Sequence, residues 1–523
     1  MDGVGAVLRA AAGIVVFMFG LTTPVLGVAG QGFPSEGASR NADCTAALEK
    51  GKQLLDQHGS SEAQQLLAEA VGSCPDVPEL WNRLGLAYDG DGHHNEAQAA
   101  FGRAIRLNPH DTRFRNNLAA SYIRSGKQTI GIAEFEKVLE LDPGNPTACL
   151  NLGSFYLRKK QYQRAVFYFD AGAFQRSQDP LELFELTEAY YGAGKANQAK
   201  ETAIQLSSLP GVDSKTHFSL GLLLAEHGEY HLAAGQFEAI PPVERDGAAN
   251  INLGMAYSKL GRFDQAHAAY SAAIRDDPAN PEPYFRIGLD ESAIGRHQAA
   301  ADWMNEAKGK APGRTDISYA LAEELMHDGN FERANSVLTL ALSVHPSDPA
   351  LREATGDLLA SQNRLQDAVK TYKECLRFDP RRLSARLSLA RAYGDMAQIE
   401  NARAALAEVL RLDPKNAEAE AQLGRYALEA GNPQDASALI RSALAHDPRN
   451  ISANEYYARL QIRDGKLNGA RETLEKLVQL DPQNYRFHFL LGGLLARLNQ
   501  RAEAEKEFEL FRRLRPKHGS SEE

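Results

Sequence analysis

Residue types that commonly do chemistry are sparse in this chain of 523 residues, and their spacing matches no catalytic motif. His227 and His231 are four residues apart, as two metal ligands on one helix can be, but they flank a turn and have no third ligand. The sequence has no phosphate-binding loop, nucleophile elbow or zinc-protease motif. We therefore expect no metal site, no cofactor and no active site, and we interpret both histidines as solvated turn residues.

The four cysteines limit the chemistry further. They are too few for a disulfide scaffold in a chain of this length, and they are too widely spaced for the paired cysteines of zinc or redox sites. Only Cys44 and Cys74 remain as candidates for a disulfide, for a reason that depends on the repeats described below.

The overall charge excludes one class of partner. The chain has 58 Lys and Arg against 68 Asp and Glu, which gives a net charge of -10. A negative protein is repelled by phosphate backbones and by anionic membrane surfaces. We therefore expect no nucleic-acid partner, and a membrane contact only through the N-terminus.

The N-terminal segment has the pattern of an export signal. An uncharged run from Ala10 to Gly30 follows Arg9, and Gly27, Val28 and Ala29 form a small-x-small cleavage pattern. Two interpretations stay open for residues 1–30, because about 20 apolar residues also suffice for a membrane anchor, here residues 10–30. In both, the remaining chain is exported and is periplasmic or secreted. Residues 31–43 are predicted to be a flexible linker, since Gly, Ser, Pro and Glu are frequent there.

Beyond the linker the chain repeats itself with a period of about 34 residues. The eighth position of the unit is almost always Gly or Ala, the twentieth is nearly always Ala, and a proline usually ends the unit. The predicted units start at residues 44, 78, 112, 146, 180, 214, 247, 281, 315, 349, 383, 417, 451 and 485.

Each unit predicts two amphipathic helices joined by a turn, because bulky apolar residues recur three to four positions apart in both halves. Small residues at positions eight and twenty allow the two helices to approach closely, and the proline stops the second helix. A glycine after the first helix is expected to adopt the left-handed cap conformation. These predicted cap residues are Gly59, Gly126, Gly194, Gly228, Gly261, Gly295, Gly329, Gly431 and Gly465.

The unit resembles the tetratricopeptide repeat family, whose signature is matched by Trp81, Leu84, Gly85, Tyr88, Ala97, Phe101, Ala104 and Pro109. The resemblance implies an all-α fold, a right-handed α-solenoid of about 14 tandem helix-turn-helix repeats over residues 44–518. Residues 519–523 would then form a disordered tail. The repeats starting at 180 and 214 match least well, and no room is left for a catalytic domain.

Cys44 and Cys74 stand at positions one and thirty-one of the first repeat, at helix ends that should be adjacent. Two interpretations stay open. In an oxidising compartment the pair would form a disulfide that staples the first hairpin, and otherwise the two thiols serve as small apolar residues.

The resemblance also implies that the first helix of each repeat lines a concave groove, with positions two, five, nine, twelve and thirteen facing inward. We call these the inner-face positions. Apolar residues occupy them in succession, and they predict either an exposed surface for a partner peptide or core between adjacent helices. This apolar stripe consists of Phe184, Tyr191, Phe218, Leu222, Ile251, Met255, Phe285, Leu289, Tyr319 and Met326.

Two polar sets flank the stripe. The first, Asn82, Asn116, Asn117 and Asn151, resembles the asparagine rows with which family members hold peptide backbones. The second, Arg391, Arg425 and Arg459, recurs at position nine and would suit an acidic segment or glycan. Acidic residues such as Glu429 and Glu455 stand nearby, so internal salt bridges are the favoured interpretation.

These features together predict a non-enzymatic interaction scaffold that binds other proteins or peptides in its groove. The alternative is a binder of acidic polysaccharide, or a structural component of an envelope export or assembly machinery.

Overall fold

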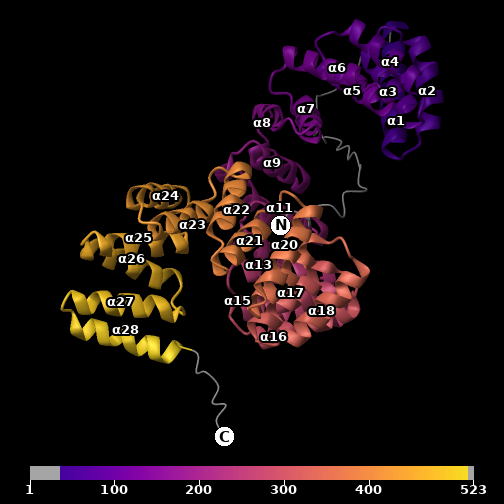
Figure 1. Ribbon diagram of the computed structural model, residues 1–523. Coiled ribbons are helices and arrows are strands. Elements are labelled where there is room, and N and C mark those ends of the chain that lie inside the picture. Colours follow the sequence, from indigo (N-terminus) through magenta and orange to yellow (C-terminus); the bar gives the residue numbers. More distant parts are fainter. Residues whose placement is uncertain (1–35, 516–523) are drawn as a thin grey trace. The chain divides into compact units, whose positions relative to one another are not determined.

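The computed structural model describes residues 36–515, with side chains from Asp43 onward. Within this range there are 28 α-helices, one short 3₁₀ helix and no strand, which confirms the all-α prediction. The chain forms two compact units that divide in sequence between Leu209 and Pro210, and each is described by itself. Figure 1 shows the helices coloured along the sequence. The predicted export segment and the predicted C-terminal tail lie outside the described residues.

The N-terminal unit contains five successive helix pairs. Its elements are α1 (Glu36–Asp56), α2 (Ser60–Ser73), α3 (Pro78–Gly90), α4 (His94–Leu107), α5 (Thr112–Arg124), α6 (Gln128–Leu141), α7 (Pro146–Arg158), α8 (Tyr162–Ala171), the 3₁₀ helix η1 (Phe174–Arg176), α9 (Pro180–Gly192) and α10 (Ala196–Ser208).

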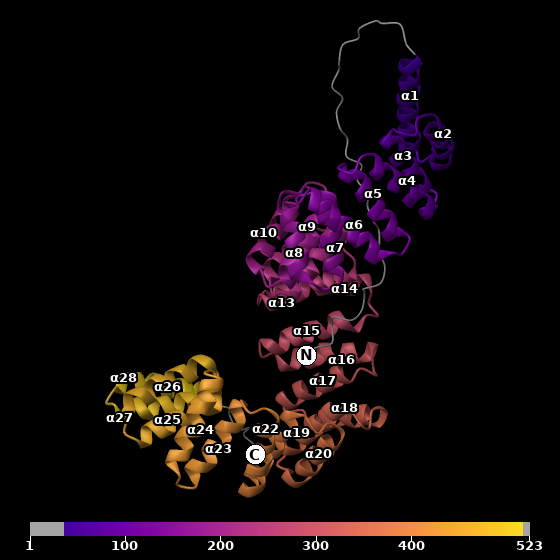
Figure 2. The ribbon, with the colours of Figure 1, turned by 90° about the horizontal axis from the view of Figure 1, so that it is seen from above.

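The C-terminal unit continues the same pairing, and successive pairs follow one another along it (Figure 2). Its elements are α11 (Ser214–Glu226), α12 (Tyr230–Ala239), α13 (Gly247–Lys259), α14 (Phe263–Asp276), α15 (Pro281–Ala293), α16 (His297–Lys310), α17 (Thr315–His327), α18 (Phe331–Val344), α19 (Pro349–Ser361), α20 (Leu365–Phe378), α21 (Leu383–Asp395), α22 (Ile399–Leu412), α23 (Ala417–Glu429), α24 (Pro433–His446), α25 (Ile451–Arg463), α26 (Leu467–Leu480), α27 (Tyr485–Arg497) and α28 (Arg501–Leu514).

The first helix of every repeat from the second onward begins at the residue that the period predicts. Helix α7 shows the cause. Asn145 Oδ1 accepts a hydrogen bond from the backbone N–H of Ala148 at 3.1 Å, and Pro146 occupies the first helical position, where no backbone donor is required. The same pairing of Asn or Asp with Pro starts α9, α15 and α19.

Two predictions near the first repeat are wrong. Helix α1 begins at Glu36, so residues 36–43 of the predicted linker are helical. Gly59 is not the left-handed residue of its turn: His58 has φ 60°, and Gly59 is already the residue before α2, with φ -84°. The left-handed residue is the fifteenth of every repeat, and the chain also places Lys160 there, with φ 57°. The period therefore determines the turn, and glycine is favoured there without being required.

The two helices of a hairpin meet where the eighth residue faces the twenty-fourth. An ideal Cβ at Gly254 would lie 2.4 Å from Cε1 of Tyr270, closer than real contacts allow. The same approach recurs at Gly51 with Leu67, Gly85 with Phe101, Gly153 with Phe169, Gly221 with Phe237, Gly288 with Met304, Gly356 with Tyr372, Gly424 with Ile440 and Gly492 with Phe508.

Thr187 occupies the eighth position of the weakly matching repeat that starts at 180. A smaller residue at the facing position makes room for it. The twenty-fourth residue of that repeat is the small Ala203. The buried hydroxyl of Thr187 donates to the backbone carbonyl of Leu183 at 2.7 Å and lies 3.0 Å from Thr202 Oγ1. In this repeat, hydrogen bonds of a buried hydroxyl thus replace the usual packing of a bulky side chain against a small residue.

Neighbouring repeats are joined by hydrogen bonds to buried carboxylates. Ser258 Oγ on α13 donates to Asp290 Oδ2 on α15 at 2.7 Å, and Ser292 Oγ on α15 donates to Glu324 Oε1 on α17 at 2.6 Å. Both carboxylates are buried. Because each bond crosses from one first helix to the next, these pairs help to hold the first helices side by side.

The close approach at Gly254 predicts opposite effects for one substitution at two helical glycines. Gly254→Ala should lower the free energy of unfolding by about 1–3 kcal/mol, because the buried ring of Tyr270 must move. Gly235→Ala in α12 meets open space and should be neutral or stabilising by up to about 1 kcal/mol. Urea denaturation followed by circular dichroism measures both, and equal effects would contradict the packing interpretation.

Candidate binding faces of the first helices

The first helices of the C-terminal unit lie beside one another in several places. Helix α13 contacts both α11 and α15, α19 contacts both α17 and α21, and α23 contacts α25. Side chains at the inner-face positions of these helices therefore belong to neighbouring elements, and their exposure decides which of them a partner can reach.

The apolar stripe of the C-terminal unit is divided between core and surface. Phe285 is buried in a core cluster, with the guanidinium of Arg314 over its ring at 5.4 Å. Leu289 and Tyr319 pack against the same cluster. By contrast, Leu222 is 40% exposed. Phe285 is therefore a core residue, and Leu222 is accessible to solvent.

Between these extremes, Phe218, Ile251 and Met255 are half-buried on α11 and α13. The ring of Phe218 meets that of Phe237 edge to face, with centroids 5.9 Å apart. Since α11 and α13 contact each other, these three residues and Leu222 come from adjoining helices, and together they form one partly accessible group within the stripe. We call this set the α11–α13 apolar face.

The remaining two residues of the stripe belong to the N-terminal unit. Phe184 on α9 is half-buried, and Tyr191 is buried. They are part of a separate compact unit and are not added to the α11–α13 apolar face.

The asparagine row is largely occupied by contacts within the protein. Asn117 Nδ2 donates to Asn82 Oδ1 at 2.8 Å, and Asn116 Nδ2 donates to Asn145 Oδ1 at 3.0 Å. Asn151 Nδ2 donates to a backbone carbonyl of its own helix at 2.8 Å. Asn82 and Asn116 are buried, so these two amides link helices, and the half-exposed Asn117 and Asn151 are the members that keep solvent access.

The arginine row follows the salt-bridge interpretation at two of its three positions. Arg425 Nη1 lies 3.2 Å from Glu429 Oε1, and Arg459 Nη2 lies 2.5 Å from Glu455 Oε1, each pair one turn apart on one helix. Arg391 is exposed. Two of the three guanidinium groups are therefore already neutralised.

Sequence reasoning missed a group of carboxylates on α17 and α19. Tyr319 Oη donates to Glu323 Oε1 at 2.7 Å, and Tyr372 Oη donates to Asp357 Oδ1 at 2.6 Å. Burial raises the pKa of both carboxyl groups, and repulsion from the neighbouring Glu353 raises both further. Glu323 and Asp357 share the ninth position of adjacent repeats, and comparing that position between repeats would have revealed the pair.

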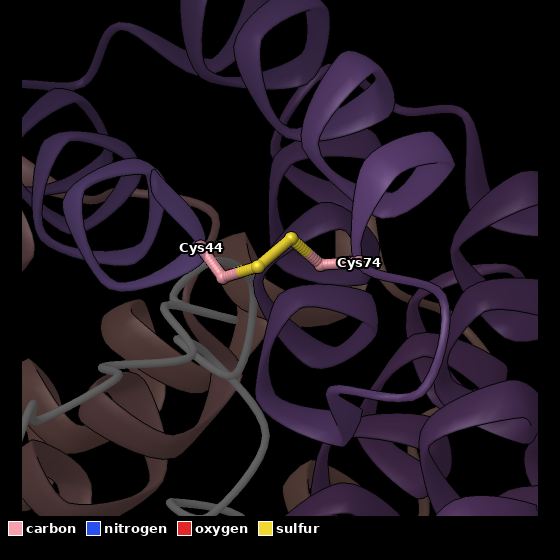
Figure 3. Close-up of a disulfide and its surroundings, with 2 residues drawn as sticks. All are labelled: Cys44 and Cys74. Carbon is pink, nitrogen blue, oxygen red and sulfur yellow. A yellow bond between two sulfur atoms is a disulfide. The ribbon is translucent and has the colours of Figure 1, made fainter. Parts of the chain in front are cut away.

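Cys44 on α1 and Cys74 after α2 are joined by a disulfide, with their Cα atoms 6.2 Å apart (Figure 3). Both cysteines are buried among Leu67, Val71 and Leu80. The other two cysteines, Cys149 and Cys375, are buried free thiols.

The predicted turn histidines His227 and His231 are both exposed. Among the described side chains, no three His, Cys, Asp or Glu residues are grouped closely enough to hold a metal ion. Within residues 36–515, no helix combines the length and apolar character that crossing a bilayer requires.

Comparison with known families gives one consistent result. A family model described as a tetratricopeptide repeat matches residues 83–146, 121–180, 251–315 and 319–382, and a second model of the same description matches residues 359–426, 427–479 and 461–518. Together these ranges span more than half of the chain.

Similar proteins share only part of their length with this chain. It is 31% identical over 109 residues to the TPR repeat-containing thioredoxin TTL4 of Arabidopsis thaliana, over 21% of this chain and 15% of that protein. It is 23% identical over 217 residues to the TPR repeat-containing protein YpiA of Bacillus subtilis (strain 168), over 41% of this chain and 51% of that protein. The chain thus spans about half or less of these relatives.

Among solved structures, the chain is similar to yeast Tom70, with 15% identity and a TM-score of 0.43, over 81% of this chain and 97% of that chain.

The raised pKa of Glu323 predicts a pH-dependent effect of Glu323→Gln. Because the pKa is higher in the folded than in the unfolded state, the charged carboxylate destabilises the fold at neutral pH, and this cost disappears as the pH falls through the folded pKa. The variant should be more stable than the parent protein at about pH 7, and this difference in stability should shrink as the pH falls through the folded pKa towards the ordinary value of 4.5. Chemical denaturation across this range measures it.

The matched control is Glu400→Gln, whose side chain is 88% exposed. This substitution should change the free energy of unfolding by no more than about 0.5 kcal/mol at every pH. A gap for Glu323→Gln that is constant with pH would show that burial does not govern this carboxylate.

Replacing both Cys44 and Cys74 by Ser should destabilise the first hairpin by roughly 3–4 kcal/mol, because the unfolded loop loses its cross-link. Since repeats contact mainly their neighbours, the loss should be local. Hydrogen exchange should rise in α1 and α2 and stay unchanged in α13–α20. Unchanged exchange in α1 and α2 would contradict a stabilising role.

Proposed function

Because the chain belongs to the tetratricopeptide repeat family, we propose that it is a non-enzymatic scaffold that binds partner proteins or peptides on the inner-face positions of its first helices. One observation carries the proposal: the α11–α13 apolar face leaves Leu222 exposed and three further apolar side chains half-exposed on adjoining helices. Apolar side chains gathered in this way favour a partner that buries apolar residues of its own.

The partner that fits this face is a helical or extended segment with apolar residues at regular spacing. Such a segment would cover Leu222 and Met255 and complete the partial burial of Phe218 and Ile251. In the C-terminal unit, the carboxylates of α17 and α19 occupy the corresponding positions farther along the chain. A partner segment with an apolar part followed by a basic part would match this order of residues.

We propose no reaction for this protein, since the predicted repeats account for most of its length. The thioredoxin named among its relatives matches over only 15% of that protein. The stretches that match family models belong to repeats whose interiors are filled by core side chains.

The proposed location is outside the cytoplasm. The uncharged run from Ala10 to Gly30 after Arg9 supports export, either as a cleaved signal or as an anchor through residues 10–30. The bond between Cys44 and Cys74 supports the same location, because disulfides persist in oxidising compartments. A place in an envelope assembly would agree with both features.

Binding of an acidic polysaccharide through the arginine row is the less supported alternative. Arg425 and Arg459 already pair with carboxylates of their own helices, so a polyanion would have to displace both pairs. Arg391 remains as the one member of the row without such a pair among the described residues.

Leu222→Asp tests the α11–α13 apolar face. A charge at the centre of an apolar contact should weaken partner binding by about tenfold or more without loss of helicity, because Leu222 is exposed and the fold does not need it. Partners are first identified by crosslinking in the native host, and their binding to the purified variant is then measured.

Leu340→Asp is the matched control, because Leu340 is 58% exposed on the second helix α18 of the same unit. It should leave partner binding unchanged. Equal loss of binding with both variants, or no loss with Leu222→Asp, would argue against this face as the binding site.

A further inference from the structure

The turn between α7 and α8 concentrates positive charge. From Phe155 to Phe169 the sequence contains no Asp or Glu. All four cations of this stretch are exposed, and none forms an ion pair with a described carboxylate: Arg158, Lys159, Lys160 and Arg164. The carboxylate of Glu185 feels the positive charge of Arg158, but it accepts its hydrogen bond from Ser154 and forms no ion pair with Arg158. The turn is therefore a local positive site on a protein of net charge -10.

Aromatic rings hold two of these cations in place. The rings of Tyr156 and Tyr168 stack with centroids 5.4 Å apart and planes 7° apart. The guanidinium of Arg164 lies 4.6 Å from the centroid of Tyr156, and Lys159 Nζ lies 5.9 Å from that of Phe155. Because the cations rest on packed rings, they lose less side-chain freedom on binding than ordinary surface lysines do.

An exposed ring adjoins the cations. Phe167 is 67% exposed, the most exposed phenylalanine among the described side chains, and its ring meets Tyr168 edge to face at 5.2 Å. It follows Arg164 by three residues on α8, so the two side chains lie on one side of that helix. The site therefore offers an apolar contact together with positive charge.

We propose that this α7–α8 basic patch, defined as Arg158, Lys159, Lys160, Arg164 and Phe167, binds an acidic segment of another protein that also has an apolar side chain. Carboxylates of the segment would pair with the cations, and its apolar side chain would cover Phe167. Of these residues only Arg158 stands at an inner-face position, so the patch is a binding surface separate from the one proposed above.

A short peptide fits the patch better than an extended polyanion. At physiological salt, charges farther apart than about 8 Å are largely screened, so a short segment responds mainly to the local positive charge. A nucleic acid, a long acidic polysaccharide or an anionic membrane would extend beyond the patch over a protein whose net charge is -10, and it would be repelled there. The unpaired cations and the exposed ring together therefore favour a peptide.

The test uses the purified full chain and a fluorescent peptide of about 12 residues that contains several glutamates and two leucines. Its binding is expected to be saturable and to weaken as salt rises. Lys159→Glu combined with Lys160→Glu should weaken it by about tenfold or more, because two attractive charges become repulsive. Phe167→Ser should weaken it by about threefold or more while leaving its salt dependence unchanged.

The matched control is Lys50→Glu combined with Lys52→Glu, which makes the same change of charge at exposed positions of α1 in the same unit. It should alter affinity by less than about threefold. Circular dichroism checks that every variant remains helical.

Three results would overturn the proposal. The first is the absence of saturable peptide binding, and the second is an equal loss of affinity in the Lys50 and Lys52 control. The third is tighter binding of anionic lipid vesicles or of an acidic oligosaccharide than of the peptide, since the patch would then serve a different class of ligand.

Discussion

The approach of a small residue in the first helix to a bulky residue in the second helix sets the geometry of these hairpins. At Gly254 the ring of Tyr270 occupies the space that a Cβ would need, and eight further glycines meet the corresponding side chain in the same way. Where Thr187 replaces the small residue, Ala203 restores the space. Because close packing fixes the separation of the two helices, each repeat presents its first helix to its neighbours in a similar way.

This constraint explains why the proposed binding surface includes side chains such as Phe218, whose ring also packs against Phe237 within the hairpin. A hairpin cannot bury all of its apolar surface by itself, so its first helix packs against the next repeat. Phe285 is buried in a core cluster that spans several repeats, whereas Leu222 reaches solvent. The α11–α13 apolar face is therefore an apolar surface that the protein leaves partly uncovered, and binding there should also stabilise the repeats beneath it.

The charges of the chain serve three different purposes that the net charge does not distinguish. Arg425 and Arg459 pair with carboxylates of their own helices, so they contribute little to a surface potential. Glu323 and Asp357 are partly withdrawn from water and accept hydrogen bonds from tyrosines. The cations of the α7–α8 basic patch form no ion pair with a described carboxylate, and two of them lie over aromatic rings. Whether a charged side chain is available to bind a partner thus depends on its own ion pairs and burial.

The sequence by itself determined the helical class, the period and the residue at which each first helix begins from the second repeat onward, because caps such as Asn145 with Pro146 and the alternation of small and bulky residues act within one hairpin. It left open whether Cys44 and Cys74 are bonded, and whether residues such as Phe285 and Leu222 face core or solvent. Only the tertiary structure decided these questions, since the exposure of a side chain depends on what the neighbouring helix and the next repeat place against it. A single periodic pattern specifies the hairpin well, but it assigns the same position to buried and exposed residues alike.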